Sequence, residues 1–81
     1  VEAVRAFIAE HRIEAVADLG CGDFRIGARI AAGVPRYTGI DVAPSVVAWL
    51  NEHHARPGHV EFRCADASRD PLPAADLYLI R

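Results

Sequence analysis

Small and acidic residues follow three short apolar segments of the chain, and their types suit the binding of a nucleoside. Gly20, Cys21 and Gly22 follow the first segment, where glycines let the backbone lie against a ligand. Asp41 follows the second segment and lies 19 residues after Gly22, the spacing at which an acidic residue accepts hydrogen bonds from ribose hydroxyls. Asp66 follows the third, where flanking alanines would admit an adenine ring and let its amino group donate to the carboxylate.

Each of these features also has a purely structural explanation, which the sequence leaves open. Gly20 and Gly22 could simply close a tight turn between a strand and a helix. Asp41 could cap the helix that is expected to begin near Pro44, and Asp66 could be an ordinary turn residue. The helix expected after the glycines supports the functional interpretation, because the amino-terminal end of a helix favours binding of a ligand's carboxylate or phosphate group.

The pattern of apolar residues predicts the elements that must position these side chains. Val4, Phe7 and Ile8 have the spacing of an amphipathic helix, whereas residues 15–19 form the nearly continuous apolar run of a strand buried on both faces. Alternating apolar and polar residues at 60–63 indicate a strand near the edge of a sheet. The whole pattern predicts helices over about 1–12, 26–31 and 44–55, and strands over about 15–19, 37–41, 59–64 and 76–80.

Strands and helices alternate along the chain, and this order indicates the fold class. The connections are too long for hairpins and long enough for crossovers, so the strands should pair in parallel. The predicted class is α/β, with a Rossmann-like doubly wound parallel sheet and flanking helices. In such sheets ligands bind outside the carboxyl ends of the strands, where the three features above fall.

Length, charge and composition exclude several other classes of protein. The chain has 81 residues, too few for more than one domain, and its 52% hydrophobic content excludes a disordered protein. A net charge of −2 does not imply a nucleic-acid partner. No apolar run is long enough to span a membrane, so we expect a cytoplasmic protein. The two distant cysteines and the four histidines predict neither a disulfide framework nor a metal site.

The two ends of the sequence differ from those of a complete gene product. The chain begins at Val1, contains no methionine and stops at Arg81, directly after the last predicted strand. We therefore expect it to be part of a longer chain that continues beyond Arg81.

The sequence resembles the class I S-adenosylmethionine-dependent methyltransferases. The run VADLGCG at residues 16–22 looks like their motif I, residues 37–41 resemble their ribose-binding strand, and residues 60–66 resemble their adenine-side strand. Residues 76–80 are similar to their fourth strand, so the likeness extends over the chain in order and spacing. The resemblance implies S-adenosylmethionine as cofactor and a strand order of 3-2-1-4. It also implies that residues 1–81 form a cofactor-binding methyltransferase domain, truncated after the fourth strand.

The resemblance further assigns the candidate residues to parts of the cofactor. The first strand end would bind the methionine part, the second would hold the ribose and contact the adenine, and the third would bind the adenine amino group. No catalytic residue is assigned, because the family places such groups after the fourth strand. In chain order the cofactor-binding residues are Asp18, Gly20, Cys21 and Gly22, then Asp41 for the ribose and Val42 for the adenine face, then Asp66 and Ala67.

One position departs from the family pattern. Motif I usually has a third glycine two residues after Gly22, where this sequence has Phe24. Phe24 could pack under the following helix, or it could narrow the methionine pocket. The same region argues against a nicotinamide dinucleotide site, since the G-x-G-x-x-G pattern would require glycine at Arg25.

The leading hypothesis is methyl transfer from S-adenosylmethionine to an unidentified acceptor, with this segment binding the cofactor. Two alternatives stay open: a methyltransferase-like subunit that has lost its activity and serves as a binding or scaffold partner, and a nucleotide- or NAD-binding α/β domain. The slightly acidic balance favours a small-molecule acceptor over a macromolecule. Tyr37, Trp49 and Tyr78 are interpreted as core or helix-packing aromatics rather than as a surface that stacks on a substrate.

Overall fold

The computed structural model describes residues 2–80, and its helices and strands follow the order predicted from the sequence. Each predicted element is present, and its observed bounds lie within about one residue of the predicted ones. Val1, the first residue of the first predicted helix, lies outside the described residues. The elements are α1 Glu2–His11, β1 Ala15–Leu19, α2 Arg25–Ala31, β2 Arg36–Asp41, α3 Pro44–His54, β3 Val60–Cys64 and β4 Leu77–Ile80.

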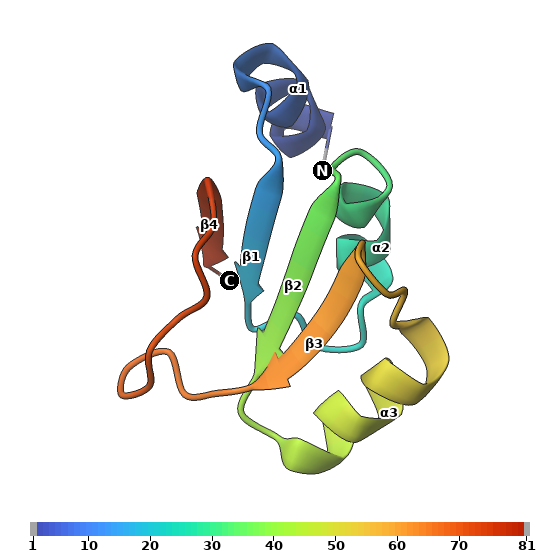
Figure 1. Ribbon diagram of the computed structural model, residues 1–81, viewed down its shortest axis with the longest axis vertical. Helices are drawn as coiled ribbons and strands as arrows, with labels where there is room; N and C mark the ends of the chain where they lie inside the picture. Colours follow the sequence, from blue (N-terminus) through green and yellow to red (C-terminus); the bar gives the residue numbers. More distant parts are fainter. Residues whose placement is uncertain (1, 81) are drawn as a thin grey trace.

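The four strands form one parallel sheet in the order β3-β2-β1-β4 (Figure 1). Strand β1 lies inside the sheet, and four of its five residues are buried, as its apolar run predicts. Strand β3 is an edge strand, as its alternating pattern predicts, and β4 forms the opposite edge. The predicted α/β class and the 3-2-1-4 order are therefore confirmed.

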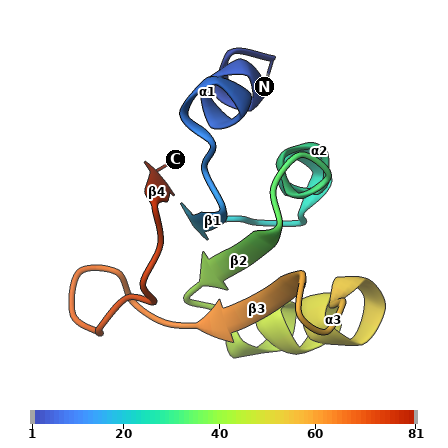
Figure 2. The same ribbon diagram turned by 45° about the horizontal axis from the view of Figure 1, so that its top comes forward.

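The three helices contribute to a single hydrophobic core on one face of the sheet. Ile8 of α1, Ile30 of α2 and Leu50 of α3 belong to the same buried cluster as Val16 and Tyr37 of the sheet. Figure 2 shows α2 and α3 lying along the same side of the sheet. This face accounts for most of the buried apolar side chains in the described part of the chain.

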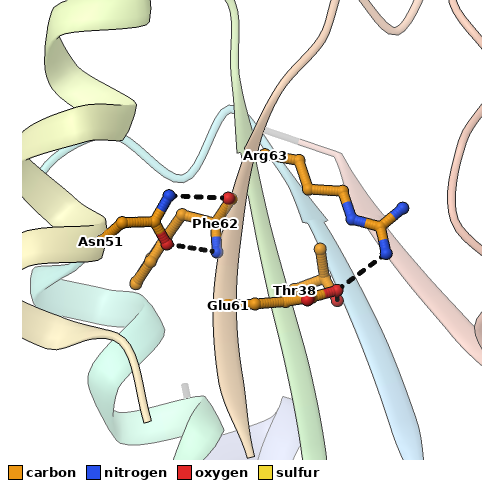
Figure 3. A network of polar contacts seen from close by, with 5 residues as sticks. All are labelled: Thr38, Asn51, Glu61, Phe62 and Arg63. Atoms are coloured by element: carbon orange, nitrogen blue, oxygen red, sulfur yellow. Dashed lines mark hydrogen bonds and ion pairs between the residues drawn. The ribbon is translucent and has the colours of Figure 1, made fainter. Parts of the chain in front are cut away.

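The opposite face of the sheet has a smaller apolar cluster and no helix among the described residues. Ala17, Leu19 and Ile40 form this cluster, and Ala65 and Ala75 from the segment between β3 and β4 pack against it. Farther toward the β3 edge the same face is polar. There the Thr38 hydroxyl and the Arg63 guanidinium both donate hydrogen bonds to the Glu61 carboxylate, at 3.4 and 2.9 Å (Figure 3).

A side chain of α3 hydrogen-bonds to one residue of the edge strand β3. The Asn51 amide donates to the Phe62 carbonyl at 3.0 Å and accepts from the Phe62 N–H at 3.1 Å (Figure 3). Unpaired N–H and C=O groups on an edge strand invite pairing with other chains. The two bonds satisfy one such residue and fix α3 against the sheet, next to the end of β2 where Asp41 lies.

No helix among residues 2–80 has the length and apolar character that crossing a bilayer requires. Cys21 is buried and Cys64 is exposed.

Candidate cofactor site

The glycine turn after β1 adopts a backbone conformation that favours glycine. Gly20 and Gly22 have φ angles of 79° and 58°, in the left-handed region where other L-residues are strained. A Cβ atom built on Gly22 would meet no atom within 4 Å, so the turn has open space on that side. This turn lies at the carboxyl ends of the strands, at the lower end of the sheet in Figure 1.

Backbone hydrogen bonds tie the glycine turn to the end of β2. The N–H groups of Gly20 and Cys21 both donate to the Ile40 carbonyl, at 2.8 and 3.2 Å. The Cys21 side chain is buried, and its sulfur would lie 3.0 Å from a Cβ on Gly39, so glycine at that position leaves room for it. The first two predicted parts of the site are therefore held together by the backbone itself.

Asp41 bridges the glycine turn and the start of α3. Its Oδ2 accepts a hydrogen bond from the Gly22 N–H at 3.4 Å, and its Oδ1 accepts one from the Ala43 N–H at 3.1 Å. The second bond closes a turn directly before α3 and is not the helix cap considered from the sequence, because the N-cap residue is Ala43 and no side chain caps the helix. The first bond connects the carboxylate to the glycine turn. A carboxylate has about four lone-pair positions, so these bonds leave acceptor capacity for a ligand.

An open cavity of about 390 Å³ lies between the glycine turn and α3. Ser45 and Trp49 were not among the predicted site residues, yet they line it together with Gly22 and Asp41. Of the three aromatics interpreted as core or helix-packing residues, Tyr37 is buried as predicted, whereas Trp49 and Tyr78 are 47% and 41% exposed and lie outside the core. The Trp49 ring packs within α3 instead, stacked on His53 with ring centroids 4.6 Å apart. The missed signal was the i, i+4 spacing of Ser45 and Trp49 on a helix that begins directly after Asp41. The lining residues are Gly22, Asp23, Asp41, Ser45, Val46 and Trp49.

Asp23, which lines this cavity together with Asp41, has a lowered pKa. The Arg25 backbone N–H donates to Asp23 at 3.0 Å, and the Arg25 guanidinium forms an ion pair with it at 3.1 Å. The backbone hydrogen bond is the main cause that lowers the pKa of Asp23 below its ordinary value. Asp23 thus stays negatively charged at neutral pH beside Asp41.

The third strand end lies next to Asp41 but turns its acidic side chain toward its own loop. The Ala65 N–H donates to the Asp41 carbonyl at 3.0 Å, which joins the end of β3 to the end of β2. The Asp66 carboxylate accepts from the Ser68 N–H and hydroxyl, at 2.9 and 2.6 Å, which is the turn role considered from the sequence. Ala67 is exposed in this turn, and Val42 is 65% exposed at the start of the segment after β2.

Replacing Ser68 with alanine should raise the pKa of Asp66 part of the way toward that of an unperturbed aspartate. The Ser68 hydroxyl is the main cause that lowers the pKa of Asp66, and the Ser68 N–H, which alanine keeps, is the second. Because the pKa is depressed in the fold, the turn's stabilisation is complete above the unfolded pKa and is lost as pH falls through the folded one. Carboxyl NMR titration measures the shift, with Ser45→Ala as the control. An unchanged pKa would contradict the assigned contact.

Asp18 is placed differently from the other candidate residues. Its side chain is fully buried, on the sheet face that packs against the helices, and its Oδ2 accepts a hydrogen bond of 2.5 Å from the Tyr37 hydroxyl. The structure therefore brings Gly20, Gly22 and Asp41 together at the surface. Asp18 precedes that turn in β1 and is buried away from the surface.

Phe24, the residue at the position of the third motif glycine, lies in the hydrophobic core. Its side chain is 7% exposed, and its ring centroid lies 5.0 Å from that of Phe62, 5.4 Å from Tyr37 and 5.2 Å from His54. Its backbone still adopts the left-handed conformation, with φ of 71° and ψ of 7°. The structure thus matches the first of the two possibilities left open by the sequence, in which Phe24 packs under the following helix.

A larger cavity of about 520 Å³ lies elsewhere, over the polar part of the sheet that carries Thr38, Glu61 and Arg63 (Figure 3). No candidate residue lines it, and Pro73 of the segment before β4 forms part of its wall. Among the described residues, no group of three or more His, Cys, Asp or Glu side chains is arranged to hold a metal ion.

Comparison with protein families identifies the chain. The family model described as "Methyltransferase domain" matches residues 16–80, which include all four strands and the glycine turn. The chain belongs to the methyltransferase domain family. Proteins of this family bind S-adenosylmethionine. Comparison with curated protein sequences gave no significant match.

Solved structures of this fold also match the chain. Human N-acetylserotonin methyltransferase in complex with SAM is 28% identical, with a TM-score of 0.69, over 95% of this chain and 23% of that protein. The [4+2]-cyclase SpnF is 26% identical, with a TM-score of 0.67, over 95% and 32%. The plantazolicin methyltransferase BpumL, solved with SAH and a desmethylPZN analog, is 22% identical, with a TM-score of 0.72, over 96% and 33%. The chain thus spans a third or less of these proteins.

Proposed function

We propose that residues 1–81 form an S-adenosylmethionine-binding methyltransferase domain, truncated after β4, which binds the cofactor at the carboxyl ends of β1, β2 and β3. The observation that carries this proposal is the contact between the glycine turn and Asp41, where the Gly22 N–H donates to the carboxylate. This contact brings together the two parts that a nucleoside with an amino-acid tail requires. A charged acceptor for the ribose lies beside a turn with exposed backbone for the tail.

The roles of the candidate residues follow from their positions. Asp41 is the acceptor for the ribose hydroxyls, since its carboxylate lies at the cavity and has acceptor capacity left. Val42 is exposed beside it and packs on the adenine face. The turn residues Gly20, Cys21 and Gly22 bind the methionine part through their backbone. At the third strand end, Asp66 and Ala67 contact the adenine amino edge, and Asp66 contributes less because it already accepts two bonds from Ser68.

Methyl transfer requires little proton chemistry from these residues. S-adenosylmethionine supplies a methyl group that is already activated on a positively charged sulfur. The protein mainly has to hold the acceptor in line with that methyl group and exclude water, and orientation of this kind lowers a barrier by roughly 7–11 kcal/mol. We assign no catalytic residue within residues 1–81. Residues of the same protein beyond Arg81 complete the acceptor site.

The acceptor that we propose is a small molecule, and the protein acts in the cytoplasm. The net charge of −2 and the two carboxylates at the cavity repel a phosphate backbone rather than attract it. The alternative of an inactive scaffold subunit depended on Phe24 narrowing the methionine pocket, and burial of Phe24 in the core weakens that argument. Arg25 at the position of the third dinucleotide glycine disfavours a nucleotide- or NAD-binding domain.

Calorimetric titration of the full-length protein tests the proposal. S-adenosylmethionine and its demethylated product S-adenosylhomocysteine should bind in the micromolar range, and NAD should release no measurable heat. NAD is the control ligand, because it contains adenosine, as the two sulfur ligands do, but lacks their amino-acid tail. Absence of heat with both sulfur ligands, or binding of NAD alone, would overturn the proposed function.

A further inference from the structure

The cavity between the glycine turn and α3 continues beyond the residues proposed to bind the cofactor. Gly22 and Asp41 line it, but so do three residues of α3, namely Ser45, Val46 and Trp49. Ser45 and Trp49 are four residues apart, so the α3 part of the lining spans more than one helical turn. We call this space the ribose-side cavity, because Asp41 is the proposed acceptor for the ribose hydroxyls. A group attached to one of those hydroxyls would face its volume of about 390 Å³.

Trp49 provides the largest apolar side chain of the ribose-side cavity and is held in place by two histidines. It is 47% exposed. The His53 ring stacks on the indole with centroids 4.6 Å apart, and the His54 ring meets it edge-on at 5.3 Å. Tryptophan has only two side-chain torsions, so an indole packed in this way is a rigid surface on which a ligand loses little conformational entropy of the protein.

The charged side chains that line the ribose-side cavity are both acidic. They are Asp23 and Asp41, and no basic side chain among residues 2–80 lines it. Arg25 pairs with Asp23 at 3.1 Å but is not part of the lining. A phosphate group placed in the cavity would therefore face two carboxylates, and like charges repel. An uncharged apolar group would instead meet Val46 and Trp49.

We propose that the cofactor site has a subsite on its ribose side, which accepts an uncharged aromatic or apolar group attached to a ribose hydroxyl and excludes a phosphate there. Trp49 is the specificity-determining residue of this subsite, because the attached group packs on its indole. The inference rests on the proposed function, and it concerns which substituted nucleosides the same site admits.

Packing on Trp49 offsets the contact that the attached group removes. Substitution of one ribose hydroxyl leaves the other free to donate to the Asp41 carboxylate. An aromatic group on the indole removes apolar area from water and gains from ring-to-ring geometry. The substituted nucleoside should therefore bind no more weakly than the unsubstituted one.

The test compares three ligands in the full-length protein, namely adenosine, 2′/3′-O-(N-methylanthraniloyl)adenosine and adenosine 3′-phosphate. The wild-type protein should bind the anthraniloyl ligand at least as tightly as adenosine, and adenosine 3′-phosphate about tenfold more weakly than adenosine. Trp49→Ala should weaken the anthraniloyl ligand about tenfold while changing the adenosine affinity less than about twofold. Calorimetry gives the affinities, and far-UV circular dichroism verifies folding.

Phe7→Ala is the matched control for Trp49→Ala. Phe7 is 43% exposed on α1, and its ring centroid lies 4.3 Å from that of His11, four residues later, as Trp49 lies against His53. Phe7 does not line the ribose-side cavity, so its removal should change none of the three affinities.

Energy transfer from the indole to the anthraniloyl group gives a second readout, which a purely structural role of Trp49 would not produce. Excitation of tryptophan in the wild-type complex should give anthraniloyl emission. Trp49→Phe keeps an aromatic ring for packing, so it should retain most of the affinity but lose most of this emission.

Equal weakening of adenosine and the anthraniloyl ligand in folded Trp49→Ala would overturn the subsite. Wild-type protein that binds S-adenosylhomocysteine but rejects the anthraniloyl ligand would overturn it as well, and adenosine 3′-phosphate that binds as tightly as adenosine would contradict the exclusion of phosphate. Wild-type protein that binds neither S-adenosylhomocysteine nor adenosine would instead overturn the proposed function, so the two failures are distinguishable.

Discussion

Replacing Phe24 with alanine should lower the free energy of unfolding by about 3–5 kcal/mol, the usual cost of removing a buried aromatic ring. The ring is 7% exposed and packs against Tyr37, His54 and Phe62. Because small domains are stable by only about 5–15 kcal/mol in total, this loss is large. Urea unfolding followed by circular dichroism measures it through the midpoint at an unchanged slope.

Phe24→Gly is the matched control, because it separates the ring from the backbone. The residue has a φ of 71°, which glycine adopts without strain and alanine does not. The glycine variant should therefore be more stable than the alanine variant by roughly 1 kcal/mol, although both lack the ring. A loss below about 1 kcal/mol in Phe24→Ala would contradict the core position of the ring.

Replacing Asp41 with alanine should weaken S-adenosylhomocysteine binding about tenfold or more. Hydrogen bonds to a charged acceptor contribute roughly 1.5–3 kcal/mol each, and Asp41 is the proposed acceptor for the ribose hydroxyls. Its carboxylate also accepts from Gly22 and Ala43, so its loss removes the side-chain connection between the turn and the start of α3. Calorimetric titration of the full-length variant measures the effect.

Two control variants make the Asp41 result interpretable. Glu52→Ala removes an exposed carboxylate from α3 that is not part of the cavity lining, so it matches the change in charge and should leave affinity unchanged. Asp66→Ala should cost less than Asp41→Ala, because Asp66 is engaged with Ser68 and competes with water. Unchanged affinity in a folded Asp41→Ala variant would mean that the Asp41 carboxylate only holds the turn before α3.

The fold was predictable because its signals lie within short stretches of sequence. The apolar run at residues 15–19 indicated an inner strand, and alternation at 60–63 indicated an edge strand; both are observed. The small errors at element ends have local causes. His59, expected to begin β3, instead closes a turn before the strand, in which its N–H donates to the Arg56 carbonyl at 2.9 Å.

Parts of the site were not predictable because they depend on contacts between distant residues. The burial of Asp18 follows from a hydroxyl 19 residues away and from a helical glycine that leaves room for it. No local pattern encodes either contact. The burial of the Phe24 side chain in the core likewise depends on its contacts with the aromatic rings of Tyr37 in β2, Phe62 in β3 and His54 in α3. The exposure of Trp49 follows from how α3 packs, which Asn51 fixes through its bonds to Phe62.

A crystal structure of the full-length protein with S-adenosylhomocysteine tests most directly whether the three strand ends form one cofactor site. The account predicts the ribose hydroxyls within roughly 2.6–3.2 Å of the Asp41 carboxylate, with the amino-acid tail over the Gly20–Gly22 turn. Ligand bound in the cavity beside Thr38 and Glu61, or with its ribose away from Asp41, would contradict it.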